Sequence, residues 1–135
     1  MAFVGGDVIE VSYSHPTLGT GKFYPKAGED NTYDLGGFRG NDDANMIAGN
    51  GESIRQLNRV RGFFECVYAN DMNTKQDYEQ ACALAADPVE ATWTFTGQNG
   101  VVYTMIGSPV GDIQPNINQA TFTMKVMGTV LQQVR

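Results

Sequence analysis

The sequence has very little of the chemistry on which most catalytic and metal sites depend. Its only histidine, His15, stands directly before Pro16 in a stretch with the composition of a turn. Serine and cysteine nucleophiles need a histidine that a third group orients, and nothing in this stretch suggests one. The cysteines lack the Cys-x-x-Cys spacing of zinc sites. We therefore expect no enzyme, no cofactor and no bound metal.

The two cysteines favour a structural role. Cys66 falls in an apolar strand pattern and Cys82 in an apolar helix pattern. Because free cysteine behaves as a small buried hydrophobe, we expect two reduced thiols. A disulfide between them remains an open alternative.

Long hydrophobic runs and a basic, signal-like N-terminal segment are missing as well. The apolar runs are only a few residues long, whereas about 20 are needed to cross a bilayer. With 15 acidic and 9 basic residues, the net charge is −6. This charge repels phosphate groups and anionic lipid. We expect folding in a cytoplasm, no membrane partner and no tight binding of DNA.

What the sequence does contain favours strands and turns. Hydrophobic residues make up 41% of the chain, charged residues 18%, and there are 16 glycines. A chain of 135 residues encloses one core but not two. We therefore expect one mainly β domain over residues 1–135.

Alternating apolar residues predict strands in the N-terminal half. Residues 7–13 place Ile9, Val11 and Tyr13 on one face of a strand. Residues 54–69 predict a second, longer strand with a bulge or bend at its glycine. The apolar face of this longer strand comprises Val60, Gly62, Phe64, Cys66 and Tyr68.

One helix is predicted, over about residues 74–86. Thr74 and Asp77 have the spacing of a capping box, and Asp87 followed by Pro88 ends the pattern. Its short apolar stripe predicts close packing on a sheet. The stripe comprises Tyr78, Ala81, Cys82 and Ala85.

The remaining sequence predicts further strands. Trp93 and Phe95 alternate with threonines, and Asn99-Gly100 is a hairpin signal before a return strand over residues 101–106. Both aromatic residues are expected in the core, together with Phe122 on a last strand that extends past Gly128. The apolar side of this last strand comprises Ala120, Phe122, Met124 and Val126.

Residues 27–53 predict a long loop, with at most short strand pieces. Connections of more than about 15 residues are uncommon inside compact domains, and this one is rich in apolar residues that suit docking against another molecule. We interpret it as an inter-subunit arm. A cover over its own subunit is the alternative. Its apolar residues are Tyr33, Leu35, Phe38, Met46 and Ile47.

Charged residues lie in and after this loop. Asp42 and Asp43 are adjacent carboxylates in a glycine-rich stretch, which suits a solvated acidic face rather than an acid/base pair. Arg55, Arg59 and Arg61 form the only group of basic residues. We expect this group to pair with the acidic loop rather than with a polyanion.

The same loop contains an incomplete calcium pattern. Asn41, Asp43, Asn45 and Glu52 match positions 1, 3, 5 and 12 of a calcium-binding loop. Met46 occupies the place of the turn-forming glycine, and neither flank predicts a helix. We do not expect calcium binding.

The order of these elements resembles that of bacteriophage tail tube proteins. The resemblance covers most of the chain from about residue 7, and its clearest part is the C-terminal half. The segments that carry it are the arginine-rich strand 59–65, the acidic turn and helix 71–86, the hairpin 93–103, the turn 107–112 and the final strand 120–128.

The resemblance implies an antiparallel β-sandwich or barrel with one flanking helix, an architecture that type VI secretion tube proteins share. It also implies assembly into six-fold rings that stack into a hollow conduit for genome delivery. The expected partners are other copies, other tail proteins and passing DNA, and the expected location is the virion tail, assembled in the host cytoplasm. Two alternatives stay open: a head decoration or baseplate subunit, and a small carbohydrate-binding β-sandwich in which Trp93 and the tyrosines stack on sugars.

Overall fold

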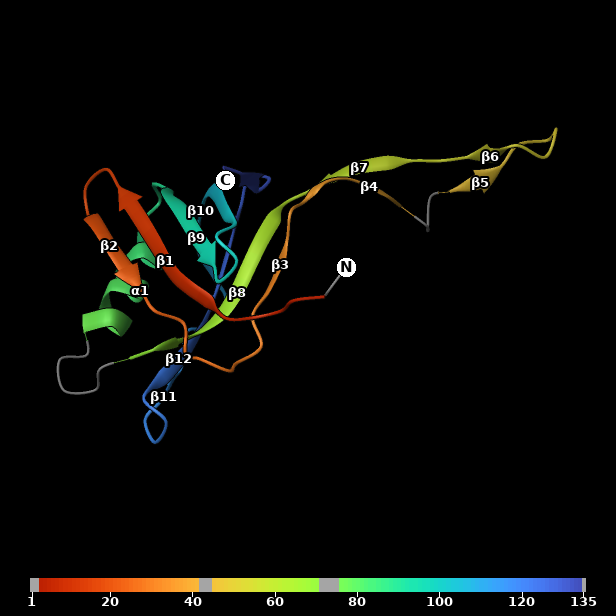
Figure 1. The fold of residues 1–135 in the computed structure, drawn as a ribbon. Coiled ribbons are helices and arrows are strands. Elements are labelled where there is room, and N and C mark those ends of the chain that lie inside the picture. The colour runs from red at the N-terminus through yellow and green to blue at the C-terminus, as the bar shows by residue number, and fades with distance from the viewer. Residues whose placement is uncertain (1–2, 42–44, 71–75, 135) are drawn as a thin grey trace.

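The computed structural model describes residues 3–41, 45–70 and 76–134. A single antiparallel sheet folds over so that its two halves face each other, one helix lies beside it, and a narrow two-stranded arm projects away from this body (Figure 1). The strand order is β2 (Gly19–Phe23), β1 (Val8–His15), β9 (Ala91–Gly97), β10 (Val102–Val110), β12 (Thr121–Gly128), β8 (Gly62–Ala69) and β3 (Thr32–Asp34).

The sheet has two edges, β2 and β3, so the mainly β sandwich is confirmed and the closed barrel is not. Two short strands lie off the main path: β11 (Pro115–Asn116) pairs with β12, and β13 (Gln132–Gln133) pairs with β10. The helix α1 (Gln76–Ala86) lies on the side of the body away from the arm (Figure 1).

Aromatic side chains fill the space between the two halves of the sheet. Trp93, on β9, is fully buried, as the alternation with threonines predicts, and Phe122, on β12, is also in the core. The indole of Trp93 lies 5.6 Å from the ring of Tyr13, 6.2 Å from that of Phe23 and 6.1 Å from that of Phe64. Strands from both halves therefore meet at one side chain.

Two strands approach closely at a pair of glycines, one of which accepts the hydrogen bond of this indole. Gly107 and Gly128 are opposite each other on β10 and β12, and an added Cβ on Gly128 would lie 2.0 Å from the carbonyl oxygen of Ile106. The close approach leaves the carbonyl of Gly107 available to accept a hydrogen bond of 2.9 Å from Trp93 Nε1. The buried indole N–H is therefore satisfied.

The first strand departs from its predicted alternation at Ile9. Val11 and Tyr13 are buried as expected, but Ile9 is 53% exposed. The pairing steps from Val8 opposite Gly97 to Glu10 opposite Thr96, so β1 has one extra residue there. The extra residue of such a bulge is unpaired, which explains why the side chain of Ile9 leaves the core.

The predicted strand over residues 54–69 is not continuous. Its core face is confirmed from Gly62 to Tyr68, but Val60 is 40% exposed. At Gly62 an added Cβ would lie 2.6 Å from the side chain of Leu131 and 2.8 Å from the carbonyl oxygen of Leu35. This crowded crossing is the predicted bend, and it separates the body strand β8 from the arm.

The predicted helix is present, with a different buried stripe. It ends at Ala86, before Asp87 and Pro88, as expected, while Thr74 lies outside the described residues. Ala81 and Leu84 are buried, whereas Ala85 is exposed. The helix therefore packs through positions i and i+3, and its one large core residue, Leu84, was not in the predicted stripe.

The C-terminal strands follow the predicted order. The Asn-Gly turn has its glycine at φ 84°, and Phe122, Met124 and Val126 are all buried. The last strand does not continue past Gly128, because the buried Leu131 interrupts it before β13 returns to β10. No helix in the described part of the chain is both long enough and apolar enough to cross a membrane.

Replacing Trp93 by alanine should lower the free energy of unfolding by about 3–5 kcal/mol, because the largest core side chain is removed. Trp93→Phe should cost less, since a ring remains, although the carbonyl of Gly107 then loses its donor. Urea denaturation followed by far-UV circular dichroism measures both variants. A Trp93→Ala protein as stable as the parent would contradict the central position of the indole.

The two thiols, which are free in the structure, should differ in reactivity. Burial raises the pKa of the Cys66 thiol to about 11, and only the thiolate reacts. At pH 8 an aromatic disulfide reagent should therefore modify at most one thiol in the folded chain and two after denaturation. The Cys82→Ser variant is the control, and its rapid modification while folded would disprove the burial of Cys66.

Candidate functional site: a projecting two-stranded arm

Residues 37–41 and 45–60 form the described part of the projecting arm, which is not an irregular loop. Strand β4 (Gly37–Gly40) pairs with β7 (Leu57–Val60), and β5 (Met46–Ile47) pairs with β6 (Ser53–Ile54) farther along. The predicted loop 27–53 thus contains β3 of the body and then the outgoing half of the arm. The returning half of the arm belongs mostly to the predicted strand 54–69. The sequence predicts a long loop with at most short strand pieces; it does not indicate their pairing into an arm, because strands of two to four residues are too short to show alternation.

The root of the arm is held to the body by specific contacts. Asp34 Oδ1 accepts a hydrogen bond of 2.9 Å from the backbone N–H of Gly36 and is also bonded to the guanidinium of Arg39. Chiefly because of Arg39, the pKa of Asp34 is lowered. The carbonyl of Leu35 accepts a 3.0 Å bond from the N–H of Leu131. These contacts fix the direction in which the arm leaves β3.

Beyond its root the arm carries large apolar side chains that its own subunit does not cover. Both its faces contribute, because Phe38 and Leu57 lie on one face of the β4–β7 pair and Val60 lies on the other. The exposed fractions are Phe38 59%, Met46 65%, Ile47 77%, Ile54 48%, Leu57 49% and Val60 40%.

An arm of this kind is poorly supported by its own contacts. A two-stranded hairpin without further packing is at best marginally stable in water. All four residues of β7 are exposed, as are both residues of β5 and both of β6. The apolar surface on both faces is what a partner would need to bury.

Of the apolar residues predicted to contact another copy, some lie on the body and the others on the arm. Tyr33 lies on the edge strand β3, with its ring 5.4 Å from that of Phe95 and 5.3 Å from that of Tyr103. It therefore belongs to the body, as does Leu35. Phe38 and Ile47 lie on the arm itself.

The predicted arginine group lies on or beside the arm, but not all of its expected acidic partners are among the described residues. Asp42 and Asp43 lie outside the described residues. Arg59 lies over the ring of Phe38, 4.9 Å from its centroid. Arg61 Nη2 donates to the carbonyl of Met127 at 3.1 Å. No carboxylate in the described ranges forms an ion pair with either arginine or with Arg55.

Arg55 differs from the other arginines of the arm. It is exposed and passes beside Gly40, where an added Cβ would lie 3.2 Å from its Nε. Arg39 has Asp34 and Arg59 has the ring of Phe38. Among the described residues, Arg55 has neither a carboxylate nor an aromatic ring as partner.

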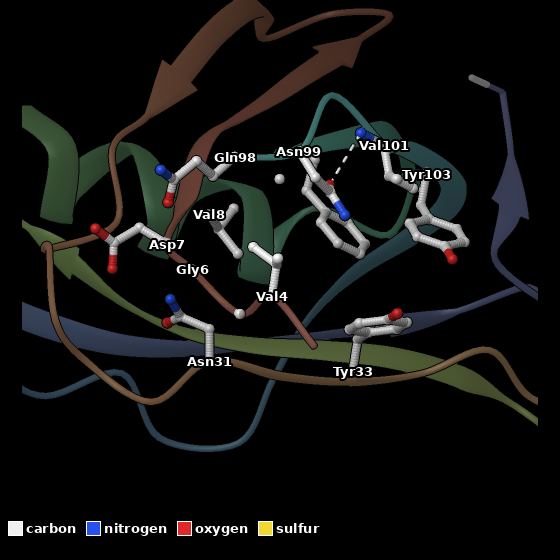
Figure 2. Close-up of a pocket in the computed structure, with 13 residues that line it drawn as sticks. Val4, Gly6, Asp7, Val8, Asn31, Tyr33, Gln98, Asn99, Val101 and Tyr103 are labelled. Carbon is white, nitrogen blue, oxygen red and sulfur yellow. Dashed lines mark hydrogen bonds between the residues drawn. The ribbon is translucent and has the colours of Figure 1, made fainter. Parts of the chain in front are cut away.

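A cavity that the sequence does not signal opens in the body near the N-terminal segment. Its volume is about 430 Å³, and it lies between residues 4–8, β3 and the β9–β10 hairpin. Figure 2 shows Asp7, Asn31 and Gln98 gathered at one end, with Tyr33 and Tyr103 at the other. These residues are far apart in the sequence, which is why no motif contains them.

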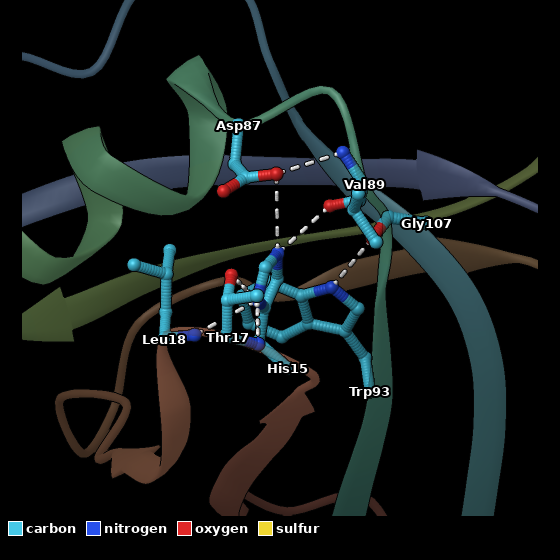
Figure 3. Close-up of polar contacts among 7 residues, drawn as sticks. All are labelled: His15, Thr17, Leu18, Asp87, Val89, Trp93 and Gly107. Atoms are coloured by element: carbon cyan, nitrogen blue, oxygen red, sulfur yellow. Dashed lines mark hydrogen bonds and ion pairs between the residues drawn. The ribbon is translucent and has the colours of Figure 1, made fainter.

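The environment of His15 is structural. Its Nδ1 accepts backbone N–H bonds from Thr17 at 3.1 Å and Leu18 at 3.0 Å, and its Nε2 lies 2.9 Å from the carbonyl oxygen of Val89 (Figure 3). Asp87 is 3.5 Å from Nε2. A Thr-His-Asp order is present in space, but both ring nitrogens are used to hold the β1–β2 turn against the segment after α1.

The aromatic and acidic residues considered for other functions also have definite places. Trp93 is fully buried and cannot stack on a sugar, whereas Tyr33 and Tyr103 line the cavity. Asn45 and Glu52, from the calcium pattern, belong to the arm, where the carbonyl of Glu52 accepts a bond from Ala48.

Sequence comparisons add no relative to this picture. No protein-family model matches the chain, and no curated protein matches it in sequence.

The arm should be dispensable for folding of the body. Gly37 and Val60 are opposite each other in the β4–β7 pair, so residues 38–59 can be replaced by an Asn-Gly turn without moving β3 or β8. We expect the free energy of unfolding to change by less than about 1 kcal/mol, because surface changes have small effects, and self-association to be lost. Thermal unfolding and sedimentation velocity measure the two outcomes.

A milder variant serves as the matched comparison. Ile47→Ser with Ile54→Ser keeps the arm but removes apolar surface near its tip. Weakened association of this variant would attribute the loss to buried apolar area rather than to chain length. If the shortened protein associates like the parent, the arm is not the contact between copies.

Proposed function

We propose that this protein is a non-enzymatic structural subunit of a phage-type tail tube, which assembles into six-fold rings that stack into a hollow conduit for genome delivery. The observation that supports this function most directly is the arm. It is a two-stranded extension that projects from the body (Figure 1). Its exposed apolar side chains lie on both faces. Such a segment is stabilised when a neighbouring copy covers it.

The body offers edges that suit a closed ring. Strands β2 and β3 end the sheet on either side, and each has backbone groups without a neighbouring strand over part of its length. Pairing such edges between copies protects them, and a ring leaves no edge free. The six-fold symmetry comes from the resemblance of the element order to tail tube proteins.

One outer face of the sheet suits a passage for DNA. The pairing of β1, β9 and β10 brings hydroxyl side chains together on the face opposite the aromatic core. Lys22 on β2 lies 3.6 Å from Glu10 on β1, and Arg59 and Arg61 line a hollow beside Thr92 and Thr104 at the border of this face. We assign this face to the conduit, since hydroxyl side chains make up most of it. The hydroxyl residues are Ser12, Ser14, Thr92, Thr94, Thr96 and Thr104.

The alternative of another virion protein, such as a decoration or baseplate subunit, shares the use of an arm. It differs in the shape of the assembly, because stacking of identical rings gives tubes of variable length, whereas those subunits form small closed oligomers.

Purified protein should therefore form rings or tubes as its concentration rises. Because burial of the apolar arm residues dominates the contact, assembly should persist at about 1 M salt, where the Debye length is only ~3 Å. Negative-stain electron microscopy and sedimentation velocity over a concentration series test this. A monomer at every concentration and salt condition would exclude the proposed function, and small closed oligomers that never stack would favour the decoration or baseplate role.

A further inference from the structure

The cavity near the N-terminal segment has the features of a site for a cationic side chain. Its volume of about 430 Å³ is within the range of roughly 300–1,000 Å³ that is usual for binding pockets. Its polar end contains the carboxylate of Asp7 and the carboxamides of Asn31 and Gln98 (Figure 2). Its other end is aromatic, with Tyr33 and Tyr103. An arginine prefers this combination, because it pairs with carboxylates and stacks on aromatic rings.

The polar end has unused hydrogen-bonding capacity. Asp7 Oδ1 accepts a 2.9 Å bond from the N–H of Gly28, while Oδ2 has no donor among the described residues. Asn31 uses its Oδ1 to accept a 3.2 Å bond from the N–H of Val67, and its amide group donates to no described residue. The aromatic end is packed, since the ring of Tyr33 lies 5.3 Å from that of Tyr103 and 5.4 Å from that of Phe95. A guanidinium would find an acceptor at one end and a fixed aromatic surface at the other.

The distribution of charge indicates where that guanidinium comes from. Of the 9 basic and 15 acidic residues of the chain, three of each lie in residues 37–60. The arm is therefore neutral, and the body carries the whole net charge of −6. Arg55 is the exposed arginine of the arm that lacks a partner among the described residues, whereas the cavity offers a carboxylate oxygen that lacks a donor.

We propose that this cavity receives the side chain of Arg55 from the arm of a second copy of the chain. The inference rests on the proposed self-assembly and names the surface on which the arm docks. The arm of the same copy projects away from the body (Figure 1), so its own Arg55 does not return to its own cavity. Ile54 precedes Arg55 directly and Leu57 follows it by two residues; both are about half exposed and would cover Val4, which lines the cavity.

A charge exchange between the two surfaces tests the proposal in the full-length chain. Arg55→Glu and Asp7→Lys should each raise the concentration needed for assembly about tenfold or more, because each places like charges together. The double variant Arg55→Glu with Asp7→Lys should recover most of the loss. Arg59→Glu is the matched control, since it makes the same charge change on the arm, and Asp7→Lys should not rescue it.

A disulfide experiment tests the contact directly, even where a variant assembles poorly. Chains carrying Arg55→Cys are mixed with chains carrying Gln98→Cys, both in a Cys82→Ser background, and oxidised. The expected product is a dimer on a non-reducing gel. The control pair combines Arg55→Cys with Glu79→Cys, on the exposed side of α1, and should give no dimer.

The outcomes separate this inference from the function on which it rests. If the parent protein does not assemble, the proposed function fails. If the parent assembles but the charge exchange shows no rescue and no selective disulfide forms, the cavity is not the receiver of Arg55. Its carboxylate, carboxamides and tyrosines would then be available for a small polar ligand such as a saccharide.

Discussion

The hydrogen bond from the indole of Trp93 to the carbonyl of Gly107 is the contact around which the body is organised. Three aromatic rings from strands of both sheet halves lie within 6.2 Å of the indole, and the indole N–H donates to Gly107, where β10 and β12 approach closely across two glycines. The largest core residue, its polar partner and the strand crossing are therefore mutually dependent. The indole N–H is therefore satisfied within the body itself.

The arm has the opposite character, and this contrast links the fold to assembly. The ring of Phe38 has only the guanidinium of Arg59 over it, and Ile47 near the tip is 77% exposed. The root, by contrast, is fixed by Asp34, Leu35 and the crowded crossing at Gly62. Because the root is fixed, the exposed apolar side chains of the arm are held at a defined place outside the subunit. Binding then loses less conformational freedom than it would with a disordered loop.

The sequence predicts the body well because its strands are long enough to show alternation. The hairpin after Trp93 and the core face of β8 both follow from period-two patterns. Prediction from the sequence fails where one extra residue changes the strand register, as at the bulge that exposes Ile9. It also fails where strands are too short to show alternation, as in the arm. The cavity could not be predicted, since Asp7, Tyr33 and Tyr103 come to line one space only after the sheet has folded over.

In the proposed assembly, the separation of charge gives the arm a further role. Bodies that each carry the net charge of −6 repel one another, and at physiological salt this repulsion is felt over a Debye length of about 8 Å. Roughly a dozen residues in each direction, at ~3.3 Å per residue, give the neutral arm a reach of up to about 40 Å. The arm can therefore make apolar contact before the acidic bodies approach. The neutral charge of the arm and its length therefore act together. Salt limits the repulsion to distances near the body surface, and burial of apolar side chains on the arm then outweighs it.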